Sequence, residues 1–163
     1  MSETYELSDE LKSEIDHWTA FYPPEQKQSA VISALTLVQE ADGGWLKTEM
    51  MDAVAEYLEM PKIAVYEVAS FYSMLETEPV GRNIVAFCTN ISCMLRGAED
   101  MVRHAEQKLG IKLGETTRDG RITLKMEEEC LAGCVGAPMM TVNGHYHENL
   151  TAKKIDEILD GLE

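Results

Sequence analysis

Apolar residues recur at helical spacing through the first half of the chain. In four segments they lie three or four positions apart, which places them on one face of a helix. The predicted inward-facing residues are Leu11, Ile15, Trp18 and Tyr22; Val31, Ala34, Leu35 and Val38; Met51, Val54, Ala55 and Leu58; and Val65, Val68, Ala69 and Tyr72. Ser8 and Ser29 are predicted to cap the first two helices, and Pro61 to lie in the first turn of the fourth. Short amphipathic helices joined by brief loops predict a helical bundle over residues 1–78.

The pattern changes in the second half, residues 79–163. The expected strands are residues 83–88, 121–126, 139–142 and 145–148. Apolar spacing predicts one helix from about Met94 to Leu109, and Thr151 is predicted to cap a final helix. Asn143-Gly144 predicts a tight turn between the last two strands. The order strand, helix, strand, strand, strand, helix predicts a thioredoxin-like α/β domain, so the whole chain is expected to be α+β.

All four cysteines lie in this second half, as the pairs Cys88-x4-Cys93 and Cys130-x3-Cys134. One pair follows the first expected strand and the other follows the second. A right-handed crossover makes these two strands parallel, so their carboxyl ends share one edge of the sheet. We therefore expect four thiolates to converge in the crevice beyond that edge, where open α/β sheets usually bind ligands.

The spacing of the pairs bears on what they bind. Structural zinc sites typically use cysteines separated by about two to four residues. The pairs here, with four and three intervening residues, also suit two metal atoms that each take one pair, as in a 2Fe–2S cluster. Zinc and free redox-active thiols remain alternatives, although a thioredoxin-type dithiol would have two intervening residues. Gly97, Gly133 and Gly136 are expected to let backbone N–H groups approach sulfur. The acids Glu127–Glu129, beside Cys130, predict a low reduction potential.

Several motifs of the chain resemble one known family. The two cysteine motifs read CTNISC at residues 88–93 and CLAGCVGAP at 130–138. Before them, GWL, VASFYS and PVGR occur in the order of the family at 44–46, 68–73 and 79–82. Over about residues 28–163 the chain resembles the family of thioredoxin-like 2Fe–2S proteins that occurs in bacterial NADH–quinone oxidoreductase. It departs from many members at Ala132-Gly133, where they place glycine directly after leucine.

The resemblance implies an electron-transfer subunit of NADH–quinone oxidoreductase, respiratory complex I. It implies one 2Fe–2S cluster held by Cys88, Cys93, Cys130 and Cys134, with no catalytic residue in the chain itself. The implied partners are the flavoprotein that binds FMN and NADH, with the cluster close to the flavin, and other components of the peripheral arm. The same chain type could serve the diaphorase side of an NAD-dependent hydrogenase or formate dehydrogenase. A zinc-stapled interaction module without redox chemistry is the hypothesis from another class.

Composition and charge narrow the choice of partners. The 163 residues have a formal charge of −15, and residues 1–78 alone contribute −12. Such a surface repels phosphates and anionic lipids, which argues against binding to nucleic acid or to a membrane surface. No apolar segment approaches ~20 residues and the start lacks a signal-peptide pattern, so a cytoplasmic protein is expected. Because no dinucleotide-binding or P-loop pattern occurs, NADH oxidation is expected on a partner protein.

Overall fold

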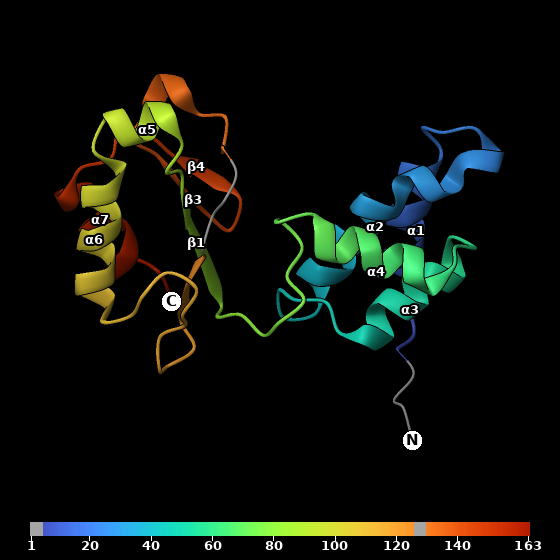
Figure 1. Ribbon diagram of the computed structural model, residues 1–163. Coiled ribbons are helices and arrows are strands. Elements are labelled where there is room, and N and C mark those ends of the chain that lie inside the picture. The colour runs from blue at the N-terminus through green and yellow to red at the C-terminus, as the bar shows by residue number, and fades with distance from the viewer. Residues whose placement is uncertain (1–4, 126–129) are drawn as a thin grey trace. The chain divides into compact units, whose positions relative to one another are not determined.

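The chain folds into two compact units, each with its own buried core. The computed structural model describes residues 5–125 and 130–163, and it divides into Met1–Pro79 and Val80–Glu163 (Figure 1). The first unit is helical, and the second combines helices with a mixed four-stranded sheet. The predicted α+β fold class with helices first is therefore confirmed. None of the helices within the described residues is long and apolar enough to cross a membrane.

The helical unit packs its helices around aliphatic and methionine side chains. Its elements are α1 (Asp9–Thr19), the 3-10 helix η1 (Pro24–Ala30), α2 (Val31–Ala41), α3 (Thr48–Tyr57) and α4 (Lys62–Phe71). The inward faces predicted for α2 and α3 are buried throughout. In α1 only Ile15 is fully buried, and Trp18 is 42% exposed. The helix ends at Thr19, before the predicted stripe is complete, so Tyr22 lies beyond it and is also exposed.

Helix starts in this unit follow the capping rules in part. The Ser8 side chain accepts a hydrogen bond from the backbone N–H of Leu11 at 3.2 Å, so the predicted cap of α1 is confirmed. The predicted Ser29 cap is wrong, because Ser29 lies inside η1, which runs directly into α2. Proline with its fixed φ favours a helical first turn, and Pro24 begins η1 in this way. Pro61 is the N-cap residue of α4, one position earlier than predicted.

The second unit is built on a sheet with strand order β2-β1-β3-β4. Its elements are β1 (Asn83–Phe87), α5 (Ile91–Leu95), α6 (Ala98–Leu109), β2 (Ile122–Lys125), the 3-10 helix η2 (Cys134–Gly136), β3 (Met140–Val142), β4 (His145–His147) and α7 (Ala152–Asp160). Strands β1 and β2 are parallel, whereas β3 is antiparallel to both β1 and β4. Asn143 and Gly144 both have positive φ between β3 and β4, as the predicted hairpin turn requires.

The single helix predicted over residues 94–109 is two helices in the structure. α5 ends at Leu95, and Gly97 has a φ of 88° before α6 begins at Ala98. This left-handed conformation is strained for residues with a side chain but not for glycine, and it breaks the helix. Leu95, which shares the apolar spacing of this segment, is 77% exposed as a result, while Val102 and Ala105 of α6 are buried.

Helices α6 and α7 cover one face of the sheet and lie side by side (Figure 1). The buried residues of this layer are Val85, Phe87, Val102, Ala105, Ile122, Leu124, Met140, Val142, Leu150, Ile155 and Leu159. A hydrogen bond of 2.8 Å between His104 Nε2 and Asp156 Oδ1 connects α6 to α7. The Thr151 side chain caps α7 by accepting from the N–H of Lys154 at 3.2 Å, as predicted. This packing holds the parallel strands β1 and β2 in a fixed register.

Candidate metal centre

Both cysteine pairs lie beyond the same edge of the sheet. In the parallel register Ala86 of β1 stands opposite Lys125 of β2, so the two strands end at nearly the same level. Cys88 follows β1 directly, and Cys93 lies within α5. Cys130 and Cys134 belong to the chain that follows β2, and Cys134 begins η2. The acids Glu127–Glu129, on which the predicted low potential depends, lie outside the described residues.

Each of the four free thiols lies close to at least one of the others. The Cys88 thiol lies within hydrogen-bonding reach of the thiols of Cys93 and Cys130. Cys130 is in turn within reach of Cys134. Across residues 5–125 and 130–163, no three His, Cys, Asp or Glu side chains are gathered around one point as a single metal ion would require. The four thiols therefore lie near one another beyond the sheet edge.

The two pairs differ in their exposure to solvent. Cys88 and Cys93 are buried against Ala98, Ala137 and Met139, whereas Cys130 and Cys134 are exposed. Burial, together with the neighbouring Cys88, raises the pKa of Cys93 to about 11. Burial also acts to raise the pKa of Cys88, but backbone N–H groups outweigh it, and that pKa lies below its ordinary value. One side of the candidate site is thus dry and the other faces solvent.

Backbone N–H groups point at three of the sulfur atoms. The N–H groups of Asn90 and Leu131 approach the Cys88 sulfur, and that of Met139 approaches the Cys93 sulfur. The N–H of Ala132 donates to Cys130 Sγ at 3.4 Å. Such bonds favour negative charge on sulfur. The residues that supply these N–H groups were not identified from the sequence, because their approach to sulfur depends on how the loops fold.

The glycines expected to let N–H groups approach sulfur, Gly97, Gly133 and Gly136, have restricted surroundings or conformations. Gly97, with its positive φ, ends the helical conformation between α5 and α6. A Cβ on Gly136 would lie 2.6 Å from Cγ of Glu148, and one on Gly133 would lie 2.8 Å from Cε of Met139. These two positions are therefore restricted by neighbouring side chains. That these glycines let backbone N–H groups approach sulfur stays a prediction.

Exposed apolar side chains accompany the cysteines. Four of them, Ile91, Met94 and Leu95 of α5 and Val135 of η2, form what we call the apolar rim. Val135 directly follows Cys134 and is 99% exposed, so it does not shield the thiols from water. Large apolar side chains that face solvent together are characteristic of protein–protein contact sites.

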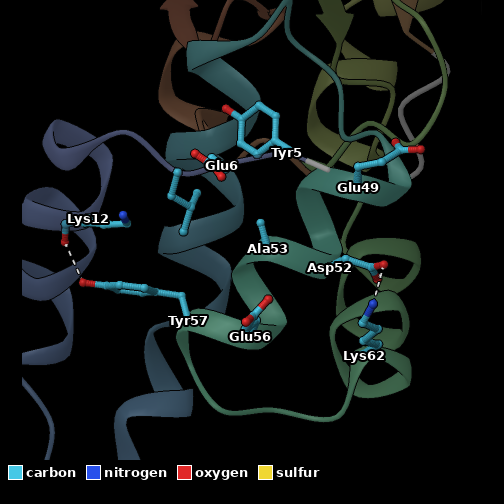
Figure 2. A pocket seen from close by; sticks show the side chains of 10 residues that line it. Tyr5, Glu6, Lys12, Glu49, Asp52, Ala53, Glu56, Tyr57 and Lys62 are labelled. Atoms are coloured by element: carbon cyan, nitrogen blue, oxygen red, sulfur yellow. Dashed lines mark hydrogen bonds and ion pairs between the residues drawn. The ribbon is translucent and has the colours of Figure 1, made fainter. Parts of the chain in front are cut away.

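A separate cavity of about 790 Å³ lies in the helical unit and contains no cysteine (Figure 2). It is lined by Tyr5, Glu6, Leu7, Lys12, Glu49, Asp52, Ala53, Glu56, Tyr57 and Lys62. Two interactions cross its wall: the Lys62 ammonium pairs with Asp52 at 2.6 Å, and the Tyr57 hydroxyl donates to the Lys12 carbonyl at 3.4 Å (Figure 2). The Tyr57 hydroxyl also donates to Asp16 Oδ1 at 2.7 Å. Tyr57 therefore joins α3 to α1.

Tyr57 is expected to make the stability of the helical unit depend on pH in the alkaline range. Burial and the Asp16 carboxylate raise its pKa from 10.0 to about 12. Because the folded state holds this proton more tightly, the contribution is complete below pH ~10 and is lost as pH rises through ~12. Tyr57→Phe should lower the free energy of unfolding by about 1–2 kcal/mol near neutral pH and by progressively less towards pH ~12. Urea unfolding across this range measures the difference.

The exposed Tyr22, changed to phenylalanine, is the control for this measurement. It retains every contact of Tyr57, so its unfolding free energy should run parallel to that of the wild type at each pH. A Tyr57→Phe variant that also runs parallel to the wild type would show that the Asp16 contact contributes nothing.

Comparison with known proteins identifies the family. The family model for thioredoxin-like [2Fe-2S] ferredoxins matches residues 15–163. The chain is 45% identical over 141 residues to the E subunit of NADH-quinone oxidoreductase from Rickettsia bellii, covering 86% of this chain and 84% of that protein. It is 39% identical over 159 residues to the mitochondrial NADH dehydrogenase [ubiquinone] flavoprotein 2 of Dictyostelium discoideum, covering 98% and 64% respectively.

A solved structure shares the fold. A chain of the air-oxidized NAD+-reducing [NiFe]-hydrogenase superposes with a TM-score of 0.65 at 20% identity. The match covers 80% of this chain and only 22% of the hydrogenase chain. The resemblance first seen in the cysteine motifs is thereby confirmed, and the chain belongs to the thioredoxin-like [2Fe-2S] ferredoxin family.

Proposed function

We propose that Cys88, Cys93, Cys130 and Cys134 hold one 2Fe–2S cluster, and that the chain is the thioredoxin-like electron-transfer subunit of an NADH–quinone oxidoreductase. The observation that carries the proposal is the proximity of four thiols, from two cysteine motifs, beyond one sheet edge. The names of the relatives support the choice of complex. In this assignment the chain works as part of an oxidoreductase and has no complete active site of its own.

The donor set fits this cluster. Four cysteine thiolates are the usual ligands of a 2Fe–2S cluster, which accepts and releases one electron when bound. Structural zinc sites also use four cysteines, so metal analysis must distinguish the two. The N–H groups of Asn90, Leu131, Ala132 and Met139 would stabilise the negative charge that such a site carries.

The exposed side of the site suits docking to a redox partner. Cys130 and Cys134 face solvent, and the apolar rim provides surface that a partner can cover. We assign this face to the flavoprotein that binds FMN and NADH, with the cluster close to the flavin. The apolar rim supplies the kind of apolar contact surface that such docking requires.

The remaining placement follows from the same assignment. The chain would lie in the peripheral arm of the membrane-bound complex, on the cytoplasmic side, in contact with other proteins of that arm. The likeness to the NAD+-reducing hydrogenase keeps a diaphorase-side role in a hydrogenase as the second candidate. The relatives of 45% identity are named as components of NADH-quinone oxidoreductase, and they favour that complex over a hydrogenase.

Metal and sulfide analysis of the anaerobically purified chain tests the cofactor. The expected result is two irons and two acid-labile sulfides per chain, with a single-spin EPR signal after reduction by dithionite. A colourless protein that holds one zinc ion and resists reconstitution with iron and sulfide would overturn the electron-transfer assignment.

Charged substitutions in the apolar rim test the docking face. Leu95→Glu and Val135→Glu should each weaken association with the flavoprotein by about tenfold or more, because a charge replaces buried apolar area at the interface. Phe71→Glu is a matched control, since Phe71 is a large, similarly exposed apolar residue of the helical unit. Iron content should match the wild type in all three variants. Equal losses of affinity in the rim and control variants would refute this docking face.

A further inference from the structure

The edge strand β4 and the turn after it support the second cysteine loop, residues 130–138. Three hydrogen bonds join the two segments. The Tyr146 hydroxyl donates to the Leu131 carbonyl at 2.5 Å, the N–H of Asn149 donates to the Gly136 carbonyl at 2.6 Å, and the N–H of Leu150 donates to the Pro138 carbonyl at 2.9 Å. Only the first of these three bonds comes from a side chain. Tyr146 can therefore be altered without changing the backbone contacts.

The bond from Tyr146 reaches a peptide group that also contacts sulfur. The carbonyl of Leu131 and the N–H of Ala132 belong to one peptide unit. The hydroxyl of Tyr146 donates to the oxygen of this peptide, and the N–H of the same peptide donates to Cys130 Sγ at 3.4 Å. A continuous chain of two hydrogen bonds thus runs from the tyrosine hydroxyl, through one peptide, to a candidate ligand atom.

Two features give this chain an effect on the sulfur. A peptide that accepts a hydrogen bond at its oxygen is polarised and becomes a better donor at its N–H. The orientation of this peptide also needs support, because Ala132 has a φ of 58°, a conformation that residues with a Cβ rarely adopt. Tyr146 therefore both strengthens the N–H to sulfur bond and holds the peptide in place.

We propose that Tyr146 is a positioning residue that raises the reduction potential of the group held by Cys130, acting through the peptide between Leu131 and Ala132. The inference rests on the proposed function, in which Cys130 is a ligand of the 2Fe–2S cluster. Hydrogen bonds to cluster sulfurs stabilise the more negatively charged, reduced form, so they raise the potential. Weakening the bond should lower the potential, and strengthening it should do the opposite.

A redox titration of the full-length, cluster-containing chain, followed by EPR, tests this inference with two changes at one position. Tyr146→Phe removes the hydroxyl and should shift the midpoint potential to a more negative value. Replacement of Tyr146 by 3-fluorotyrosine retains the hydroxyl as a more acidic, stronger donor and should shift it to a more positive value. Because Tyr146 is 56% exposed, neither change opens a cavity in the core. Tyr22→Phe, which alters a tyrosine of the helical unit, should leave the midpoint at the wild-type value.

The outcomes separate this inference from the proposed function. A wild-type chain without iron and sulfide would refute the proposed function, and the role of Tyr146 with it. A wild-type chain that holds the cluster, with both changes at position 146 giving the wild-type midpoint, would refute only the role of Tyr146. Shifts of the same sign for phenylalanine and fluorotyrosine would also refute it, because a merely structural disturbance does not follow donor strength. If Tyr146→Phe loses the cluster, the fluorotyrosine protein alone tests the role of Tyr146. A more positive midpoint potential then supports that role, and any other result refutes it.

Discussion

Replacing Cys88 or Cys134 by alanine is expected to abolish cluster binding, although only the first replacement should destabilise the fold. Each change removes one of the four proposed ligands, and a 2Fe–2S cluster lacking a thiolate ligand is not held stably. Iron and sulfide analysis should therefore find neither element at stoichiometric level in either variant. The visible absorption and the EPR signal should be lost with them.

The stability of the two cluster-free variants should differ because their surroundings differ. Cys88 is only 2% exposed and packs against Met139 and Ala137, so its loss removes buried contacts. A cost of about 1–2 kcal/mol in the free energy of unfolding is expected for Cys88→Ala. Cys134 is exposed, and Cys134→Ala should stay within about 0.5 kcal/mol of the cluster-free wild type.

Ser92→Ala provides the control inside the same motif. Ser92 is exposed and lies directly before Cys93. This variant should retain iron, sulfide and the wild-type stability. A Cys134→Ala protein that still binds two irons would show that Cys134 is not a ligand, whatever its place in the motif.

The convergence of the cysteine pairs could be predicted because it depends on local pattern and one rule of handedness. Strand formers at residues 83–88 and alternation at 121–126 predict β1 and β2 from the sequence. The right-handed crossover then makes the strands parallel and places their carboxyl ends together. Every step uses information carried by neighbouring residues. The same holds for the hairpin at Asn143-Gly144, where two residues determine the turn.

Other features of the site depend on contacts between segments far apart in the chain. The apolar spacing of residues 94–109 is unbroken, yet Gly97 is left-handed and Leu95 points to solvent. Periodicity records which residues are apolar and does not record where a glycine changes direction. The link from Tyr146 to Leu131 joins residues 15 positions apart across a strand edge, so no sequence spacing indicates it. Local sequence pattern therefore predicts at which edge of the sheet the cysteine pairs lie. The hydrogen bonds around them depend on tertiary packing.

Gly136→Ala is expected to have the second large effect, through overpacking beside the second cysteine loop. A Cβ at this position would lie 2.6 Å from Cγ of Glu148 and closer still to its Cβ. The Cβ of a residue cannot move without its backbone, and the backbone is tied here by the Asn149 N–H to Gly136 carbonyl bond. Such overpacking costs about 1–3 kcal/mol. Because Gly136 ends the 3-10 helix that begins at Cys134, the strain should also lower iron content.

A compensating change shows whether this contact is the cause. Glu148→Gly removes the Cβ and all later atoms that a methyl group on residue 136 would meet, so the double variant should regain stability and iron relative to Gly136→Ala alone. Gly161→Ala is the matched control, because its added Cβ would come no closer than 3.4 Å to another atom. Urea unfolding and iron analysis of the wild type, the two single variants and the double variant form a double-mutant cycle. Purely additive effects in that cycle would exclude the Glu148 contact and leave the backbone of η2 itself as the source of the strain.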